Sequence, residues 1–107
     1  KSYRIIVDVE KEEKVVNYPN PFNPEKEATQ IRIKPPKGNE TLKIKIYDQF
    51  GNIVWTKELK ATNTLVDVEW DGKNDKGKVV ANGGYICIVD IDGKTVKGKI
   101  GVWKGTK

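Results

Sequence analysis

The 107-residue sequence has no histidine, no methionine and only one cysteine. Without histidine the chain lacks the commonest general base, and no serine or threonine lies in a nucleophile-elbow sequence. Cys87 alone cannot form an internal disulfide, and its apolar neighbours predict a buried, inert thiol. The glycine turns are too short for a phosphate loop and precede no helix. We therefore expect no enzymatic activity, no catalytic residue and no cofactor.

Long hydrophobic runs and clusters of one charge are also missing. No apolar run approaches the roughly 18 residues that a membrane-spanning helix needs. The formal net charge is +5, but lysines alternate with acids, and no block of like charge has the length of a basic arm. We therefore do not expect nucleic-acid binding. The abundant Lys and Glu, together with the scarcity of Cys and Met, suit a thermophilic protein.

What the sequence does contain is alternation of apolar and polar residues, with no helical spacing of apolar positions. The run at 84–91 is apolar on both faces, which predicts a central strand covered on both sides. Asp92-Gly93 predicts a type I′ hairpin between the last two strands. Strand-like runs of this length, with turns about every ten residues, predict an all-β sandwich or barrel of seven or eight strands and essentially no helix. The runs lie at 3–10, 29–34, 41–48, 52–59, 65–70, 84–91 and 95–103.

Three motifs follow one another along the chain: NYPNPFNP at 17–24, IKIYDQFGNIVW at 44–55, and VEWDGKNDKGKVVANGGYICIV at 68–89. This order resembles the FlgD-like immunoglobulin domain and the closely similar C-terminal sorting domains of the type IX secretion pathway. The resemblance covers about residues 14–103 and implies an immunoglobulin-like antiparallel β-sandwich of seven to eight strands. The motif residues that we expect to build the fold are Tyr18, Pro19, Asn20, Pro21, Phe22, Trp70, Asp71, Gly72, Gly77 and Tyr85.

Two features depart from the family pattern. Asn74-Asp75 stands where the family usually has a single aspartate, and the strand-like run Tyr3–Val9 precedes the proline motif. We interpret residues 14–107 as the immunoglobulin-like domain. Residues 1–13 are then an extra edge strand or the end of a preceding domain. The abrupt start of the chain is typical of a piece of a longer protein.

The resemblance implies a non-catalytic module at the C-terminal end of a larger exported bacterial protein, secreted or held at the cell surface. Two roles remain open: secretion sorting or surface attachment, and a structural spacer or assembly module such as a flagellar hook-cap part. The expected partners are other domains of the parent protein or the secretion machinery. A carbohydrate-binding module is a third alternative, because exposed tryptophans can stack on sugars. Trp70 is expected in the core, Trp55 is ambiguous, and Trp103 is expected to be partly exposed.

Clustered oxygen-bearing side chains near Trp70 form a secondary candidate for a cation site: Asp71, Asn74 and Asp75. The spacing fails the EF-hand pattern, because Lys73 and Lys76 stand at the third and sixth positions counted from Asp71. A turn is favoured instead, with Asp71 capping backbone amides and the two loop glycines in left-handed conformations.

The stretch VVNYPNPFNP at 15–24 contains three prolines, which fix the backbone and remove hydrogen-bond donors. We predict a stiff corner that carries the chain from one sheet to the other. Tyr18 and Phe22 are available to pack, with Phe22 beneath the corner, and the three asparagines can bond backbone groups that no sheet ladder reaches. The alternative is a docking site for another protein.

Overall fold

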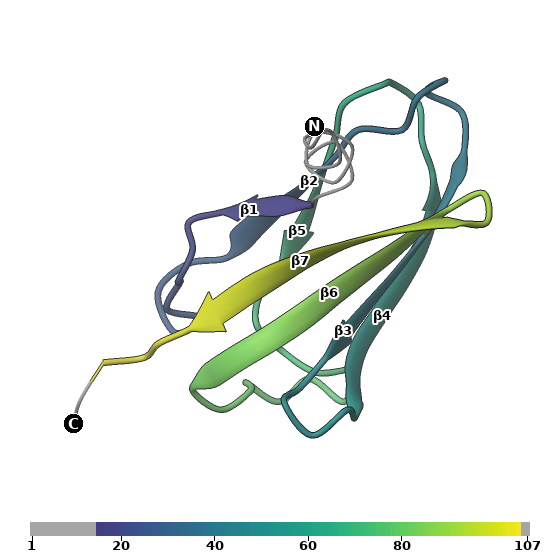
Figure 1. The fold of residues 1–107 in the computed structure, drawn as a ribbon. Helices are drawn as coiled ribbons and strands as arrows, with labels where there is room; N and C mark the ends of the chain where they lie inside the picture. The colour runs from purple at the N-terminus through teal and green to yellow at the C-terminus, as the bar shows by residue number, and fades with distance from the viewer. Residues whose placement is uncertain (1–14, 106–107) are drawn as a thin grey trace, which may run out of the picture.

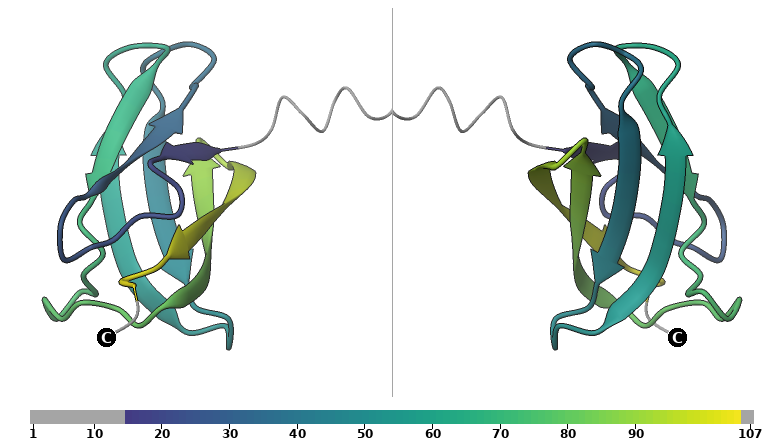
Figure 2. Two further views of the ribbon diagram at one scale, coloured as in Figure 1. Left: turned by 90° about the vertical axis from the view of Figure 1, so that its left-hand side faces the viewer. Right: turned by 90° about the vertical axis from the view of Figure 1, so that its right-hand side faces the viewer.

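The computed structural model describes residues 15–105, which form two antiparallel β-sheets packed face to face (Figures 1 and 2). One sheet has the strand order β1-β2-β5 and the other the order β4-β3-β6-β7. The predicted all-β, immunoglobulin-like sandwich is therefore confirmed. The strand-like run Tyr3–Val9 lies outside the described residues. The strands are β1 (Val16–Tyr18), β2 (Thr29–Ile33), β3 (Thr41–Tyr47), β4 (Ile53–Lys60), β5 (Val66–Trp70), β6 (Gly83–Ile91) and β7 (Lys94–Val102).

Alternation along the strands decides which side chains enter the core. In β3, Leu42, Ile44 and Ile46 are buried, while Lys43 and Lys45 between them are exposed. A strand points successive side chains to opposite faces, so this pattern places the aliphatic row between the sheets. The described part of the chain contains no helix with the length and hydrophobicity needed to cross a membrane.

The hairpin between β6 and β7 forms as predicted. Ile91 pairs with Lys94, which leaves Asp92 and Gly93 as a two-residue turn. Both turn residues have positive φ, 49° at Asp92 and 95° at Gly93. A type I′ turn requires positive φ at both positions, and the Asp-Gly sequence adopts it readily.

The prediction that the run at 84–91 is covered on both sides is wrong for its outer face. β6 lies between β3 and β7, and its inward side chains Tyr85, Cys87 and Val89 are buried. The outward Ile86 and Ile88 are only half-buried. A parallel strand between two helical layers would hide both faces, whereas this antiparallel sheet has a covering layer on one side only among the described residues.

Trp70 at the end of β5 occupies the centre of the core and is fully buried. Three aromatic rings surround it: Phe22 with a centroid separation of 5.6 Å, Tyr85 at 6.0 Å and Trp55 of β4 at 6.1 Å. The indole Nε1 donates a hydrogen bond of 3.0 Å to the carbonyl oxygen of Lys73. The core thus joins both sheets and the proline segment through one side chain.

Replacing Trp70 with alanine removes this junction and leaves a large cavity. We expect Trp70→Ala to lower the free energy of unfolding by about 3–5 kcal/mol, measured by urea denaturation. The control is Trp103→Ala, because Trp103 is 54% exposed, and its effect should stay within about 0.5 kcal/mol. A cost for Trp70→Ala below about 1 kcal/mol would contradict the central role of the indole.

Candidate functional site

The proline segment lies along the free edge of β7, the last strand of the four-stranded sheet. The Val15 N–H donates to the Lys97 carbonyl oxygen at 2.9 Å, and the Phe22 N–H donates to the Gly101 carbonyl oxygen at 3.0 Å. The Trp103 N–H in turn donates to the Phe22 carbonyl oxygen at 3.0 Å. Between these contacts the chain pairs with β2 as strand β1. Residues 15–22 therefore contact both sheets and cover an edge that would otherwise be open to pairing.

At Asn20 a side chain, and not the backbone, forms the hydrogen bonds with the edge of β7. Its Oδ1 accepts a hydrogen bond of 2.8 Å from the Gly101 N–H, and its Nδ2 donates one of 2.9 Å to the Lys99 carbonyl oxygen. Pro19 and Pro21 on either side have no N–H to offer, and both follow cis peptide bonds. A primary amide carries one acceptor and donors in the same arrangement as a peptide group. Asn20 therefore acts as a substitute rung of the sheet ladder.

The two aromatic residues of the proline motif have opposite environments. Phe22 is 1% exposed and packs edge-on against Trp70. Tyr18 is 80% exposed, so the prediction that it is available to pack is wrong. The reason is the register of β1, which turns Val16 and Tyr18 outward on the same face and leaves Asn17 between them pointing inward.

The loop after β5 is a hydrogen-bonded turn packed under the proline segment. Asp71 Oδ1 accepts a hydrogen bond of 3.0 Å from the Lys73 N–H, and Asn74 Oδ1 accepts from two further backbone N–H groups of the loop. Gly72 has φ of 79°, and a Cβ there would overlap the side chain of Pro24. Gly77 also has positive φ, 85°. This arrangement agrees with the interpretation of the loop as a capped turn with two left-handed glycines.

Asp75 connects this loop to the opposite free edge of the four-stranded sheet, at β4. Its N–H donates to the Val54 carbonyl oxygen at 2.9 Å. Its carboxylate accepts hydrogen bonds from the Thr56 N–H at 3.3 Å and from the Thr56 hydroxyl at 3.4 Å. Of the two residues that replace the usual single aspartate, Asn74 thus folds the loop and Asp75 pairs with the strand edge. The sequence alone gives no signal for this long-range contact.

The three cation-site candidates direct oxygens toward hydrogen-bond donors of the loop and of β4. Asp71 and Asn74 accept from loop amides, and Asp75 accepts from Thr56. Within residues 15–105 no group of three or more Cys, Asp or Glu side chains gathers to hold a metal ion. The donor set therefore fits a structural turn better than a coordination sphere.

Cys87 lies on the inward face of β6 with no exposed surface. Burial raises the pKa of its thiol to about 12. Because the thiolate is the reactive form, the side chain stays protonated and behaves as a small apolar group.

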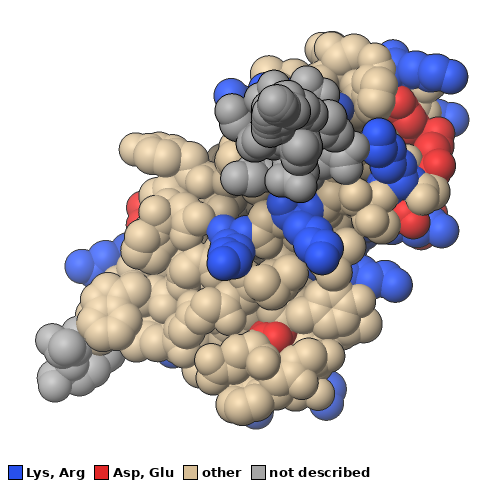
Figure 3. Space-filling view, in the orientation of Figure 1, with Lys and Arg blue, Asp and Glu red and all other residues tan. Residues whose placement is uncertain are grey.

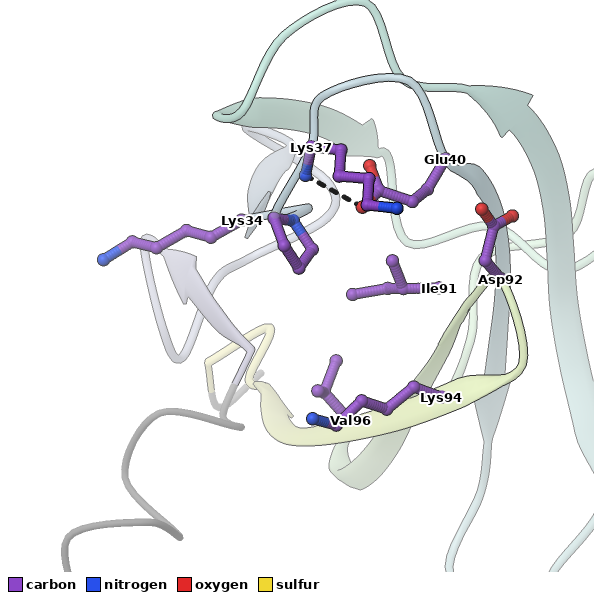
Figure 4. A pocket seen from close by; sticks show the side chains of 8 residues that line it. Lys34, Lys37, Glu40, Ile91, Asp92, Lys94 and Val96 are labelled. Atoms are coloured by element: carbon purple, nitrogen blue, oxygen red, sulfur yellow. Dashed lines mark hydrogen bonds between the residues drawn. The ribbon is translucent and has the colours of Figure 1, made fainter.

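A pocket of about 360 Å³ opens at the end of the sandwich between the β2–β3 connection and the β6–β7 hairpin (Figure 4). The buried Glu40 lies in it, and its carboxylate accepts N–H groups from Lys37, Gly38 and Asn39 at 2.9, 2.9 and 3.1 Å. Desolvation raises the pKa of this carboxyl, but the backbone hydrogen bonds outweigh it and hold the pKa below the ordinary range. The pocket is lined by Lys34, Pro36, Lys37, Glu40, Ile91, Asp92, Lys94 and Val96.

Sequence reasoning missed Glu40, because a charged residue next to a turn gives no sign of burial. The Glu40 carboxylate accepts hydrogen bonds from the backbone amides of its own loop. We therefore assign Glu40 a structural role in closing the β2–β3 loop.

Because the folded-state pKa of Glu40 is depressed, its contribution to stability is present above the unfolded pKa of about 4.3 and disappears as the pH falls through the folded value. We expect Glu40→Gln to be less stable than the parent chain at pH 7, and the difference should shrink below about pH 4. Thermal melting across pH 2–7 measures the difference in stability. The matched control is Glu58→Gln, because Glu58 is an exposed residue of β4. A deficit independent of pH would show that the carboxylate charge plays no part.

Removing the Asn20 amide should open the β7 edge. We expect Asn20→Ala to lower the free energy of unfolding by about 1–2 kcal/mol, since the three side-chain hydrogen bonds to Gly101, Lys99 and Asn17 are lost where water has partial access. Hydrogen exchange should also accelerate at the Gly101 N–H, which donates its hydrogen bond to Asn20 Oδ1. The control is Asn39→Ala at an exposed loop position. Unchanged exchange at Gly101 in Asn20→Ala would refute the substitute-rung role.

Solved structures with this fold include parts of much larger proteins. PorZ of Porphyromonas gingivalis, described as an essential bacterial surface component of the type-IX secretion system, matches with a TM-score of 0.60 and 22% identity over 92% of this chain and 12% of PorZ. Dimeric latent PorU from the same organism matches with a TM-score of 0.65 and 24% identity over 85% of this chain and 9% of PorU. At these identities the likeness shows the fold alone.

FlgD from P. aeruginosa matches with a TM-score of 0.54 and 27% identity over 67% of this chain and 58% of FlgD. The chain thus spans less than two thirds of the length of each of these proteins. No curated protein sequence matches it significantly. The family model of the FlgD Ig-like domain matches residues 20–93, which include the proline motif from Asn20 onward, the Trp-Asp-Gly loop and β6. The chain belongs to the FlgD Ig-like domain family.

Proposed function

We propose that this domain is a non-catalytic module of a larger exported protein and acts in secretion sorting or cell-surface attachment. One observation carries the proposal. The match to PorZ covers 92% of this chain but only 12% of PorZ, and the match to PorU covers 85% of this chain but only 9% of PorU. In those proteins the fold is therefore one module of a long chain. PorZ is described as a surface component of the type-IX secretion system. By analogy, the parent protein is secreted or lies at the cell surface, and its partners are its own other domains or the secretion machinery.

A second candidate is a structural spacer or assembly module. The likeness to FlgD favours it, because this match has the highest identity of the three, 27%, and covers 58% of that protein. Carbohydrate binding is the weakest alternative. Trp70 is fully buried and Trp55 packs against it, so among the tryptophans only Trp103 offers a largely exposed ring. A single ring does not make the planar platform that sugars stack on.

The deciding experiment removes residues 14–107 from the parent protein and measures the amount that reaches the cell surface. A sorting module predicts loss of export, whereas a spacer predicts normal export. The control replaces residues 14–107 with an unrelated β-sandwich of the same length. If the deletion abolishes export and this replacement restores it, export requires a folded segment of this length and not a sorting signal, which overturns the sorting role. Undiminished export after the deletion would overturn it as well.

A further inference from the structure

The outer face of the four-stranded sheet carries apolar side chains where a solvated sheet face usually has polar ones. Ile86 and Ile88 of β6 point away from the core and are half-buried. Neither belongs to the core cluster or packs against it. Figure 3 shows a broad surface of uncharged side chains on this side of the molecule, with basic side chains near its centre and an acidic one in its lower part.

The register places a lysine on each side of Ile88 and on one side of Ile86. Ile88 lies between Lys45 of β3 and Lys97 of β7, and Ile86 lies between Tyr47 and Lys99. Adjacent strands are about 4.8 Å apart, so the long lysine side chains flank the aliphatic strip closely. The result is an apolar strip on β6 between basic borders on β3 and β7.

This strip forms the floor of a shallow groove. A depression of about 540 Å³ is lined by Tyr47, Ile86, Ile88 and Lys99, among others. Its floor continues over Gly84, where a Cβ would have no atom within 4 Å. The groove therefore stays open along the outward row of β6 and has room for side chains of another molecule.

Lysines outnumber acids around the strip: Lys99 lines the groove and Lys45 and Lys97 flank Ile88, whereas Asp48 is the one acidic lining residue given for this groove. The Asp48 carboxylate accepts hydrogen bonds from the Phe50 and Asn52 N–H groups of its own turn. Lys45, Lys97 and Lys99 are exposed, and none of them forms an ion pair in residues 15–105. A partner with carboxylates beside an apolar centre would match both the lysines and the isoleucines.

We infer that this groove is a docking surface for a neighbouring polypeptide that presents an apolar centre flanked by acidic side chains. Ile86 and Ile88 give the strip an aliphatic centre, which suits apolar side chains, and Tyr47 and Tyr85 line the groove beside it. The isoleucines are half-buried beside longer lysines, so they do not project as a membrane-inserting group would. The inference rests on the proposed role of the domain as a module that packs against other polypeptides.

The test uses the 107-residue chain and NMR titration with a synthetic peptide that alternates Glu and Val. We expect shifts at the amides of Ile86, Ile88 and Lys99, and weaker binding as salt is added. A peptide with Lys in place of Glu, and another with Ser in place of Val, should leave these amides unchanged. Absence of shifts at millimolar peptide, shifts located elsewhere, or equal binding of the Lys peptide would each overturn the inference.

Charge reversal tests the lysines directly. The double variant Lys97→Glu/Lys99→Glu should weaken peptide binding about tenfold. Lys76→Glu/Lys78→Glu, with the same charge change in the loop after β5, should leave binding unchanged. Vesicles rich in anionic lipid and the polysaccharide heparin are titrated in parallel. Stronger shifts at β6 with either would overturn the polypeptide assignment and identify a membrane or a glycan instead.

The outcomes of this titration and of the export experiment are separable. Peptide binding is measured on the isolated chain and does not depend on secretion. Export that survives the deletion would remove the sorting role and leave the groove's occupant unaffected. Conversely, loss of export without peptide binding would support sorting and refute the docking groove.

Discussion

The packing around the Trp70 ring is the constraint on which the rest of the molecule depends. Its indole comes from the three-stranded sheet and meets Trp55 and Tyr85 of the four-stranded sheet, and Phe22 of the proline segment. Its Nε1 also holds the loop that follows β5, through the Lys73 carbonyl oxygen. The same side chain thus sets the distance between the sheets, the position of the proline segment and the path of the loop that reaches β4.

The elements that sequence predicts well are the local ones. Alternation of apolar and polar residues is a property of the strand itself, so β3 appears at 41–47 within the run that the sequence marks, and Asp92-Gly93 specifies its own turn. Pairing between distant segments leaves no such local pattern. The contacts of Asn20 with β7 and of Asp75 with β4 depend on residues about 80 and 20 positions away. The apolar composition of β6 is equally ambiguous, because it does not tell whether a second layer covers the outer face.

The polar residues of the family motifs act largely within the fold. Asn20 and Asp75 cover opposite edges of the four-stranded sheet, and Asp71 and Asn74 close a turn. A sheet whose two edge strands are covered resists pairing with the strands of other chains. The surface left for recognition is then a sheet face, where side chains rather than backbone groups make the contacts.

The parallel course of residues 15–22 along β7 also has a mechanical consequence. The chain enters this pairing at Val15 and leaves it at Trp103, with the Lys97, Gly101 and Phe22 carbonyl oxygens accepting bonds along the way. Tension applied at Val15 and Trp103 would pull residues 15–22 and β7 in opposite directions along their length. Every hydrogen bond between them would then carry load at the same time instead of opening one after another. This shear geometry gives the pairing between residues 15–22 and β7 resistance to a pull along the chain.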